Sequence, residues 1–162
     1  MSRIWKLVPV SLQWPVLWVA NPKFVVGVNG VILNDQGQFL LLKHRFHHDK
    51  PWGLPGGWIN RGEGVEGGLV REVWEETGYQ IQVDAFLGEE HHPLALGFFL
   101  LAHVTGGEER LDANEILDAA FFPLDDPARL PRLRSNHRRA IALAQEALTS
   151  RSRPSSRSYP VG

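Results

Sequence analysis

The chain crowds carboxylates into one stretch, GGWINRGEGVEGGLVREVWEETGY at residues 56–79, where Glu72, Glu75 and Glu76 fall within five residues. A helix predicted over residues 64–77 would place these side chains within an arc of about 100°, on one helix face. Each like-charged pair at this spacing destabilises a helix by a few tenths of a kcal/mol. Either the face is an acidic surface covered by water, or a divalent cation with oxygen ligands compensates the repulsion.

The residues around the glutamates favour the cation. Gly56 and Gly57 form a tight loop in which a backbone carbonyl can turn toward an ion, and Arg71 can neutralise Glu63. Gly78 is placed to end the helix as its cap. The opposite helix face is expected to pack on a sheet, and it carries Val65, Leu69, Val70, Val73 and Trp74.

Length and composition predict one globular domain without a strong electrostatic field. The chain has 162 residues, 43% of them hydrophobic, which suffices for a single buried core. Its 17 Lys and Arg balance 18 Asp and Glu, so neither stable nucleic-acid binding nor membrane attachment is indicated. The absence of cysteine excludes disulfides, thiolate nucleophiles and cysteine-ligated metals. We therefore expect a cytoplasmic protein.

The two ends of the chain differ in composition from the rest. Residues 1–20 form an arm with three tryptophans, which is too short and too rich in proline to span a membrane. We expect this arm to pack on the domain or on a partner subunit, with a membrane-surface role as the alternative. Residues 150–162 are rich in Ser, Arg and Pro and are predicted to be disordered. The domain itself is expected at residues 21–149.

Apolar runs and turn residues predict the remaining elements. These are strands at 24–34, 38–46, 79–88, 96–104 and 119–124, a loop at 45–57 and a closing helix at 135–148. The first two strands are expected to form a hairpin. Strands before and after one helix, with a second helix at the end, indicate an α/β (α+β) sandwich.

Seven positions resemble the signature of the Nudix hydrolases: Gly57, Glu63, Arg71, Glu72, Glu75, Glu76 and Gly78. The flanking strand order is also similar to that family, from about Phe24 to Leu148. The resemblance implies an α/β/α sandwich with a mixed central sheet. It further implies an enzyme that hydrolyses the diphosphate bond of a nucleoside diphosphate linked to another group, X, with Mg²⁺ or Mn²⁺ as cofactor.

The resemblance also implies roles for individual residues. The implied metal ligands are the carbonyl of Gly56 and the carboxylates of Glu72, Glu75 and Glu76. One of Glu72 and Glu75 would activate the attacking water. Glu63 and Arg71 would hold the glycine loop against the helix. A further acid is expected from a later loop, with Glu115 as the first candidate, followed by Asp118, Glu89 and Glu90.

Substrate contacts are expected from residues beside the signature. Lys43, His44 and Arg45 end the second predicted strand near the expected phosphate path, and Arg45 could clamp phosphate with its forked donors. Solvated basic residues at a strand end are the alternative. Trp58 and Trp52 flank the glycine loop, where they would stack on a base or support the loop by packing.

The substrate is indicated by one proline. Pro93 follows the signature at about the offset seen in Nudix enzymes that cleave ADP-ribose. ADP-ribose or a similar NDP-sugar is therefore the leading substrate, with a nucleoside monophosphate and phospho-X as products. A (d)NTP pyrophosphatase that cleanses the nucleotide pool is the alternative, and a non-catalytic nucleotide sensor is a second one. The nucleotide is the expected partner, and a homodimer is left open.

Overall fold

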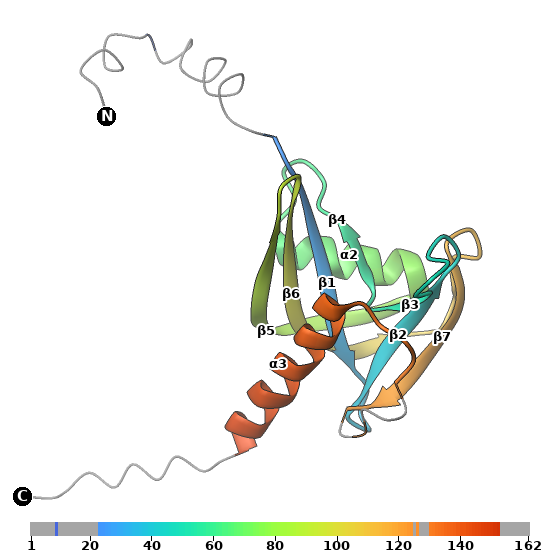
Figure 1. Ribbon diagram of the computed structural model, residues 1–162. Coiled ribbons are helices and arrows are strands. Elements are labelled where there is room, and N and C mark those ends of the chain that lie inside the picture. Colours follow the sequence, from blue (N-terminus) through green and yellow to red (C-terminus); the bar gives the residue numbers. More distant parts are fainter. Residues whose placement is uncertain (1–8, 10–22, 125, 127–129, 153–162) are drawn as a thin grey trace, which may run out of the picture.

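A mixed sheet of seven strands lies at the centre of the protein (Figure 1). The structure is a computed structural model and describes residues 9, 23–124, 126 and 130–152. Its elements in chain order are β1 (Val25–Leu33), β2 (Gln38–His44), β3 (Trp52–Gly53), β4 (Gly56–Trp58), α2 (Val65–Thr77), β5 (Tyr79–His92), β6 (Ala95–Gly107), β7 (Ile116–Pro123) and α3 (Ser135–Ser152). The predicted mixed sheet with helices is confirmed.

The strands follow the order β3-β2-β1-β6-β5, with β4 beside β1 and β7 beside β2. β1 and β6 run parallel, with Val28 opposite Phe98, whereas the other pairs are antiparallel. One edge of β1 pairs with β6 over its whole length. Its other edge pairs with β4 at residues 27–29 and with β2 at Leu33. The short strand β4 thus holds the glycine loop against the central strand.

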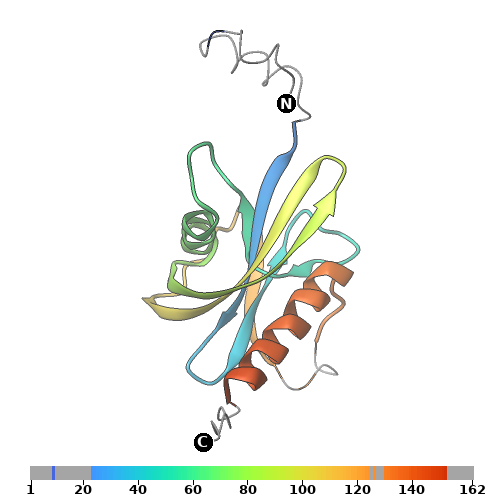
Figure 2. The same ribbon diagram turned by 90° about the vertical axis from the view of Figure 1, so that its left-hand side faces the viewer.

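Each face of the sheet has its own core, because successive side chains of a strand point to opposite faces. On β2, Leu40 and Leu42 belong to the core that includes α2, whereas Phe39 and Leu41 belong to the core that includes α3. Figure 2 shows the two helices on opposite sides of the sheet. This two-sided burial explains why the first two strands are apolar almost throughout.

Helix α2 ends as predicted, but its apolar face is narrower than predicted. Gly78 has a φ of 75°, and its N–H donates to the carbonyl of Trp74. Val70 and Trp74 were expected to pack on the sheet, and this expectation is wrong, because they are 39% and 44% exposed. The ring of Trp74 instead faces the guanidinium of Arg110, 6.0 Å from the ring centroid.

Several predicted boundaries are wrong, among them the end of the strand expected at 79–88, because β5 continues to His92. The expected loop at 45–57 contains β3 and the start of β4, because Trp52 pairs with Lys43 of β2. Strand β7 begins earlier than residue 119, and α3 continues to Ser152, past the expected start of the tail. Apart from residue 9, the arm at 1–20 lies outside the described residues, as does the tail beyond residue 152. No helix within the described ranges is long and apolar enough to cross a membrane.

Candidate active site

A cavity of about 630 Å³ is lined by β4, by α2 and by residues at the start of α3. Its acidic residues are Glu72, Glu75, Glu76, Glu90, Asp112 and Glu115. Its basic and imidazole residues are His44, His47, His92, Arg134 and His137. All three glutamates predicted to share one face of α2 therefore reach the same cavity.

Glu76 is the most buried of these carboxylates, with a relative exposure of 6%. One of its oxygens, Oε2, accepts the N–H of Gly56 at 3.0 Å, which ties α2 to β4. The pKa of Glu76 is raised to about 8, mainly by burial and also by the nearby Glu72, Glu115 and Glu75, against the opposing effect of the Gly56 hydrogen bond. A positive charge in the cavity would therefore stabilise the ionised form of Glu76.

Arg71 connects the other acidic residues of the signature. Its Nε and Nη2 donate to the two oxygens of Glu63, both at 2.9 Å, and Nη2 also donates to the carbonyl of Trp58 at 3.0 Å. Its Nη1 donates to Glu72 at 2.9 Å and to Glu75 at 3.0 Å. The hydrogen bonds from Arg71 lower the pKa of Glu63 to about 2. The predicted pairing of Glu63 with Arg71 is thus present, and it joins the loop to the helix.

The glycine loop brings its backbone against these carboxylates. Gly56 has a φ of 141°, and a Cβ added there would lie 2.1 Å from the carbonyl oxygen of Val28. A Cβ on Gly57 would lie 2.4 to 2.6 Å from the carboxylate atoms of Glu72. Only glycine leaves room for both contacts, so the loop can lie directly between the sheet and α2.

The donor atoms at this end of the cavity suit a hard divalent cation. Carboxylate and carbonyl oxygens are the ligands that Mg²⁺ and Mn²⁺ prefer. In the part of the chain that the structure describes, no three acidic or histidine side chains are already close enough to hold an ion together. Arg71 occupies oxygens of both Glu72 and Glu75, while the buried carboxylate of Glu76 faces the same space.

Glu115 lines the cavity, whereas the predicted phosphate contacts Lys43 and Arg45 do not. The guanidinium of Arg45 donates to the carbonyl of Ala113 at 2.7 Å, and its backbone N–H donates to the carbonyl of Glu115. Lys43 pairs with Asp118 in the ladder between β2 and β7. Arg45 therefore braces the loop that carries Glu115.

Of the other predicted candidates, some line the cavity and some do not. Trp58 is among the lining residues and is 60% exposed, whereas Trp52 packs edge to face on Phe122 with 5.7 Å between the ring centroids. Glu90 lines the cavity and accepts a hydrogen bond from Asn136 at 2.8 Å. Glu89 and Asp118 are not among the lining residues.

Several cavity residues have no role predicted from the sequence, among them His47, Arg134, Asn136 and His137. His44 was noted only as a neighbour of Arg45. These residues reach the cavity from the end of β2 and the start of α3, and Leu54 N–H donates to His137 Nδ1 at 3.1 Å across 83 residues of sequence. The cluster HRFHH at residues 44–48 was the available signal, but it did not indicate which side chain enters the cavity.

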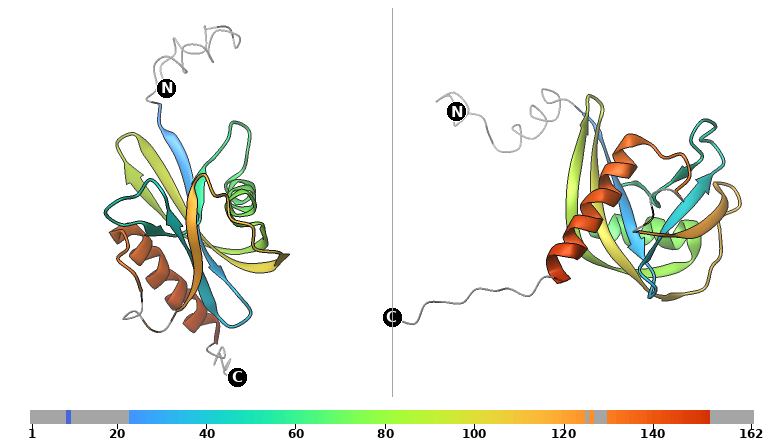
Figure 3. Two further views of the ribbon diagram at one scale, coloured as in Figure 1. Left: turned by 90° about the vertical axis from the view of Figure 1, so that its right-hand side faces the viewer. Right: turned by 60° about the horizontal axis from the view of Figure 1, so that its bottom comes forward.

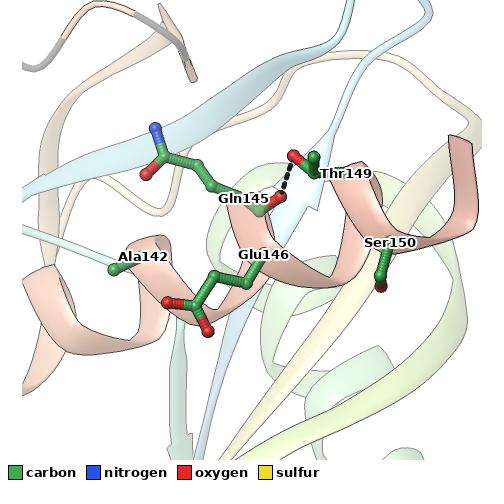
Figure 4. Close-up of a pocket in the computed structure, with 5 residues that line it drawn as sticks. All are labelled: Ala142, Gln145, Glu146, Thr149 and Ser150. Atoms are coloured by element: carbon green, nitrogen blue, oxygen red, sulfur yellow. Dashed lines mark hydrogen bonds between the residues drawn. The ribbon is translucent and has the colours of Figure 1, made fainter. Parts of the chain in front are cut away.

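Figure 4 shows a second hollow, of about 430 Å³, along the outer side of α3. Its lining residues are Ala142, Gln145, Glu146, Thr149 and Ser150, all on this one helix. The hydroxyl of Thr149 donates to the carbonyl of Gln145, within the helix itself. This hollow brings together no groups from different elements, and the larger cavity is the candidate active site.

Comparisons with known proteins agree with this choice. Residues 23–144 match the family described as NUDIX domain. Nudix hydrolase 8 of Arabidopsis thaliana is 30% identical over 85% of this chain, which spans 40% of that protein. The ADP-ribose pyrophosphatase of Methanocaldococcus jannaschii is 34% identical, and the putative 8-oxo-dGTP diphosphatase of Bacillus subtilis is 33% identical. These matches cover 72% and 67% of this chain and 70% of each relative.

A solved structure shows the same fold. The crystal structure of an ADP-ribose pyrophosphatase from Streptococcus suis superposes with a TM-score of 0.62 at 29% identity, covering 80% of this chain and 94% of that one. The family match and the similar proteins cover most of the chain, including the central sheet and the helix α2 that carries the glutamates. The chain belongs to the Nudix hydrolases, which act on diphosphate bonds.

Proposed function

We propose that the chain is a metal-dependent pyrophosphohydrolase that cleaves a nucleoside diphosphate linked to X, of the ADP-ribose or NDP-sugar type, into a nucleoside monophosphate and phospho-X. The observation that carries this proposal is the convergence of Glu72, Glu75 and Glu76 on one cavity beside the glycine loop. Glu115 adds a fourth carboxylate from a separate loop. These carboxylates would repel the phosphates of an anionic substrate unless a cation lay between the carboxylates and the phosphates.

The residues that would hold Mg²⁺ or Mn²⁺ are Glu72, Glu75 and Glu76, with the Gly56 carbonyl and Glu115 as further ligands. When bound, such a cation neutralises phosphate charge and lowers the pKa of water. Burial raises the pKa of Glu72 above its usual range, which makes its carboxylate a better proton acceptor. We assign removal of the proton from water to Glu72 or Glu75.

The remaining signature residues would position these groups. Arg71 holds Glu63, Glu72, Glu75 and the Trp58 carbonyl, so it fixes the loop against α2. The exposed ring of Trp58 on the cavity wall offers a surface on which a nucleobase could stack. No covalent enzyme intermediate is needed, because water can attack phosphorus directly.

Similar proteins support two substrate types. The Methanocaldococcus relative and the Streptococcus structure both carry the name ADP-ribose pyrophosphatase, which favours ADP-ribose or a similar NDP-sugar. The Bacillus relative, named putative 8-oxo-dGTP diphosphatase, is the observation that favours the alternative, a (d)NTP pyrophosphatase. ADP-ribose would yield AMP and ribose 5-phosphate, whereas a dNTP would yield dNMP and pyrophosphate.

A substrate panel in ¹⁸O-labelled water tests the proposal. ADP-ribose, NDP-sugars and dNTPs are each incubated with the protein and Mg²⁺ or Mn²⁺, and the products are identified by mass spectrometry. We expect one ¹⁸O atom in a phosphate group of one product, and no turnover in EDTA. Label in a sugar hydroxyl would show carbon–oxygen cleavage and refute the mechanism. Nucleotide binding without turnover of any panel member would support the sensor alternative instead.

A further inference from the structure

The cavity has a second group of side chains that the proposed hydrolysis does not use. His44 ends β2, His47 follows it, Arg134 directly precedes α3, and His137 lies in the first turn of α3; we name these four the His-Arg cluster. We propose that the His-Arg cluster binds a phosphate monoester of the substrate, separate from the diphosphate that is cleaved. This inference rests on the proposed function, because it concerns the same cavity.

His137 supplies a fixed hydrogen-bond donor. Its side chain is 7% exposed, and its Nδ1 accepts the N–H of Leu54 at 3.1 Å. Burial lowers the pKa of His137 to about 4, so the ring is neutral near pH 7 and carries its proton on Nε2. Among the described residues no hydrogen-bond partner faces Nε2, and His137 lines the cavity. An acceptor oxygen on a ligand would satisfy this donor.

The imidazole rings meet above a buried glycine. A Cβ on Gly53 would lie 3.0 Å from His137 Cε1 and 3.3 Å from His44 Nε2. The rings of His44 and His47 are 4.8 Å apart between centroids. Figure 3 shows β3 and the first turn of α3 side by side, which is the arrangement that the hydrogen bond between Leu54 and His137 requires. The cluster is therefore built from the end of β2, the loop after it and the start of α3.

The cluster has positive charge without a matching acid. Arg134 makes no ion pair with any residue in the described ranges. Its charge helps to lower the pKa of His137, where it is the largest cause after burial, and the pKa of His44, where it follows burial and His47. The partial positive charge at the start of α3 adds to that field. Glu90 is the cavity acid with a hydrogen bond to α3, and its partner there is the side-chain amide of Asn136.

These donors match a phosphate monoester in charge and in chemistry. A monoester carries close to two negative charges at neutral pH and three acceptor oxygens. Guanidinium and imidazole N–H groups supply the charge-assisted hydrogen bonds that such oxygens accept. Gly53 and Gly56 are three residues apart, so their Cα atoms are at most about 11 Å apart. One nucleotide can therefore reach the carboxylates with its diphosphate and the His-Arg cluster with its monoester.

Matched ligands that differ by one phosphate test the inference. Dissociation constants are measured by calorimetry in EDTA for ADP-ribose against ADP-ribose 2′-phosphate, and for dephospho-coenzyme A against coenzyme A. We expect the phosphorylated member of at least one pair to bind roughly tenfold tighter, as a charge-assisted contact implies. Arg134→Gln should abolish this preference, whereas Arg139→Gln, a control at an exposed position on α3 that does not line the cavity, should retain it.

Inorganic phosphate provides a direct probe. In metal-free protein, it should shift the imidazole ¹⁵N signals of His44 and His137 in the wild type and in Arg139→Gln, but not in Arg134→Gln. Equal affinities within both pairs would overturn the inference, and so would unshifted imidazole signals in the wild type. Turnover measured afterwards with Mg²⁺ separates the two proposals. Absence of any turnover would refute only the hydrolase function, whereas turnover without monophosphate preference would refute only the His-Arg cluster.

Discussion

Two arginines have opposite surroundings: Arg71 contacts glutamates that line the cavity, and Arg134 lines the cavity itself. Arg71 forms ion pairs with Glu63, Glu72 and Glu75 at 2.9 to 3.0 Å, so its charge is neutralised by side chains of the protein itself. Arg134 makes no ion pair among the described residues. A paired arginine fixes the shape of a site, whereas an unpaired one beside a cavity is available to a ligand. The acidic wall, formed by β4 and α2, is thus internally braced, and the wall at the start of α3 is open for binding.

The largest effect is expected from removing charge at the acidic wall. Glu75→Gln and Glu76→Gln should each lower kcat/KM by roughly 10²- to 10⁴-fold and weaken metal binding, because each removes a carboxylate that we propose as a metal ligand. Steady-state kinetics and metal titration measure both quantities. Glu66→Gln, an exposed glutamate on the same helix and away from the cavity, is the control. Unchanged kinetics in both variants at saturating metal would rule out the assigned site.

The next effect comes from filling the space between the loop and α2. Gly57→Ala would place a methyl group 2.4 to 2.6 Å from the carboxylate of Glu72 and push it out of position. We expect kcat to fall by about 10²-fold, as for a displaced catalytic group. Gly67→Ala is the control, because the nearest atom to its Cβ is 3.9 Å away. The thermal midpoint should be retained in both. A fully active Gly57→Ala enzyme would show that Glu72 has no fixed role.

A smaller effect is expected from loosening the brace itself. Glu63→Gln leaves the metal ligands intact but weakens the contact with Arg71, so the loop shifts. Turnover should fall by about 10- to 100-fold, as for other groups that orient ligands. Metal affinity should fall less than in Glu76→Gln. If affinity falls equally in both while the loop keeps its hydrogen exchange protection, Glu63 is itself a ligand.

The smallest effect concerns stability against pH in metal-free protein. The folded-state pKa of Glu76, about 8, lies above its ordinary value of 4.5, so folding favours the protonated form. The free energy of unfolding should therefore decline as pH rises from about 4.5 to 8. Glu76→Gln retains an acceptor for the Gly56 N–H and should remove this decline. Urea unfolding in EDTA at pH 5 and pH 8 measures the free energy of unfolding of both proteins. The same change in this free energy between the two pH values in both proteins would contradict the prediction.

The sequence predicted the braced wall well because its contacts are local. Glu63 and Arg71 are eight residues apart, and the helix period alone placed the three glutamates on one face. The open wall was largely missed, because its contacts join residues from distant segments, as the 83 residues between Leu54 and His137 show. No periodic pattern encodes such a contact.

The position of Arg45 outside the cavity has a local cause. The pairing of β2 with β7 shifts register between Lys43 and His44, and a bulge of this kind redirects side chains. Arg45, expected to clamp phosphate, consequently braces the loop of Glu115, while His44 enters the cavity. The basic character of this segment was visible in the sequence, but the irregularity was not.

The parallel pairing of β1 with β6 affects how the chain folds to an active enzyme. Val28 and Phe98 are 70 residues apart, and the glycine loop and α2 both lie within the segment that this pairing closes. Bringing two strands together that are distant in sequence loses conformational entropy before stabilising contacts form. This loss slows folding. The carboxylates proposed to bind metal therefore reach their final geometry only when the central sheet closes. Recovery of activity should follow the slow cooperative step of refolding, and a chain released before β6 is synthesised would have no working catalytic centre.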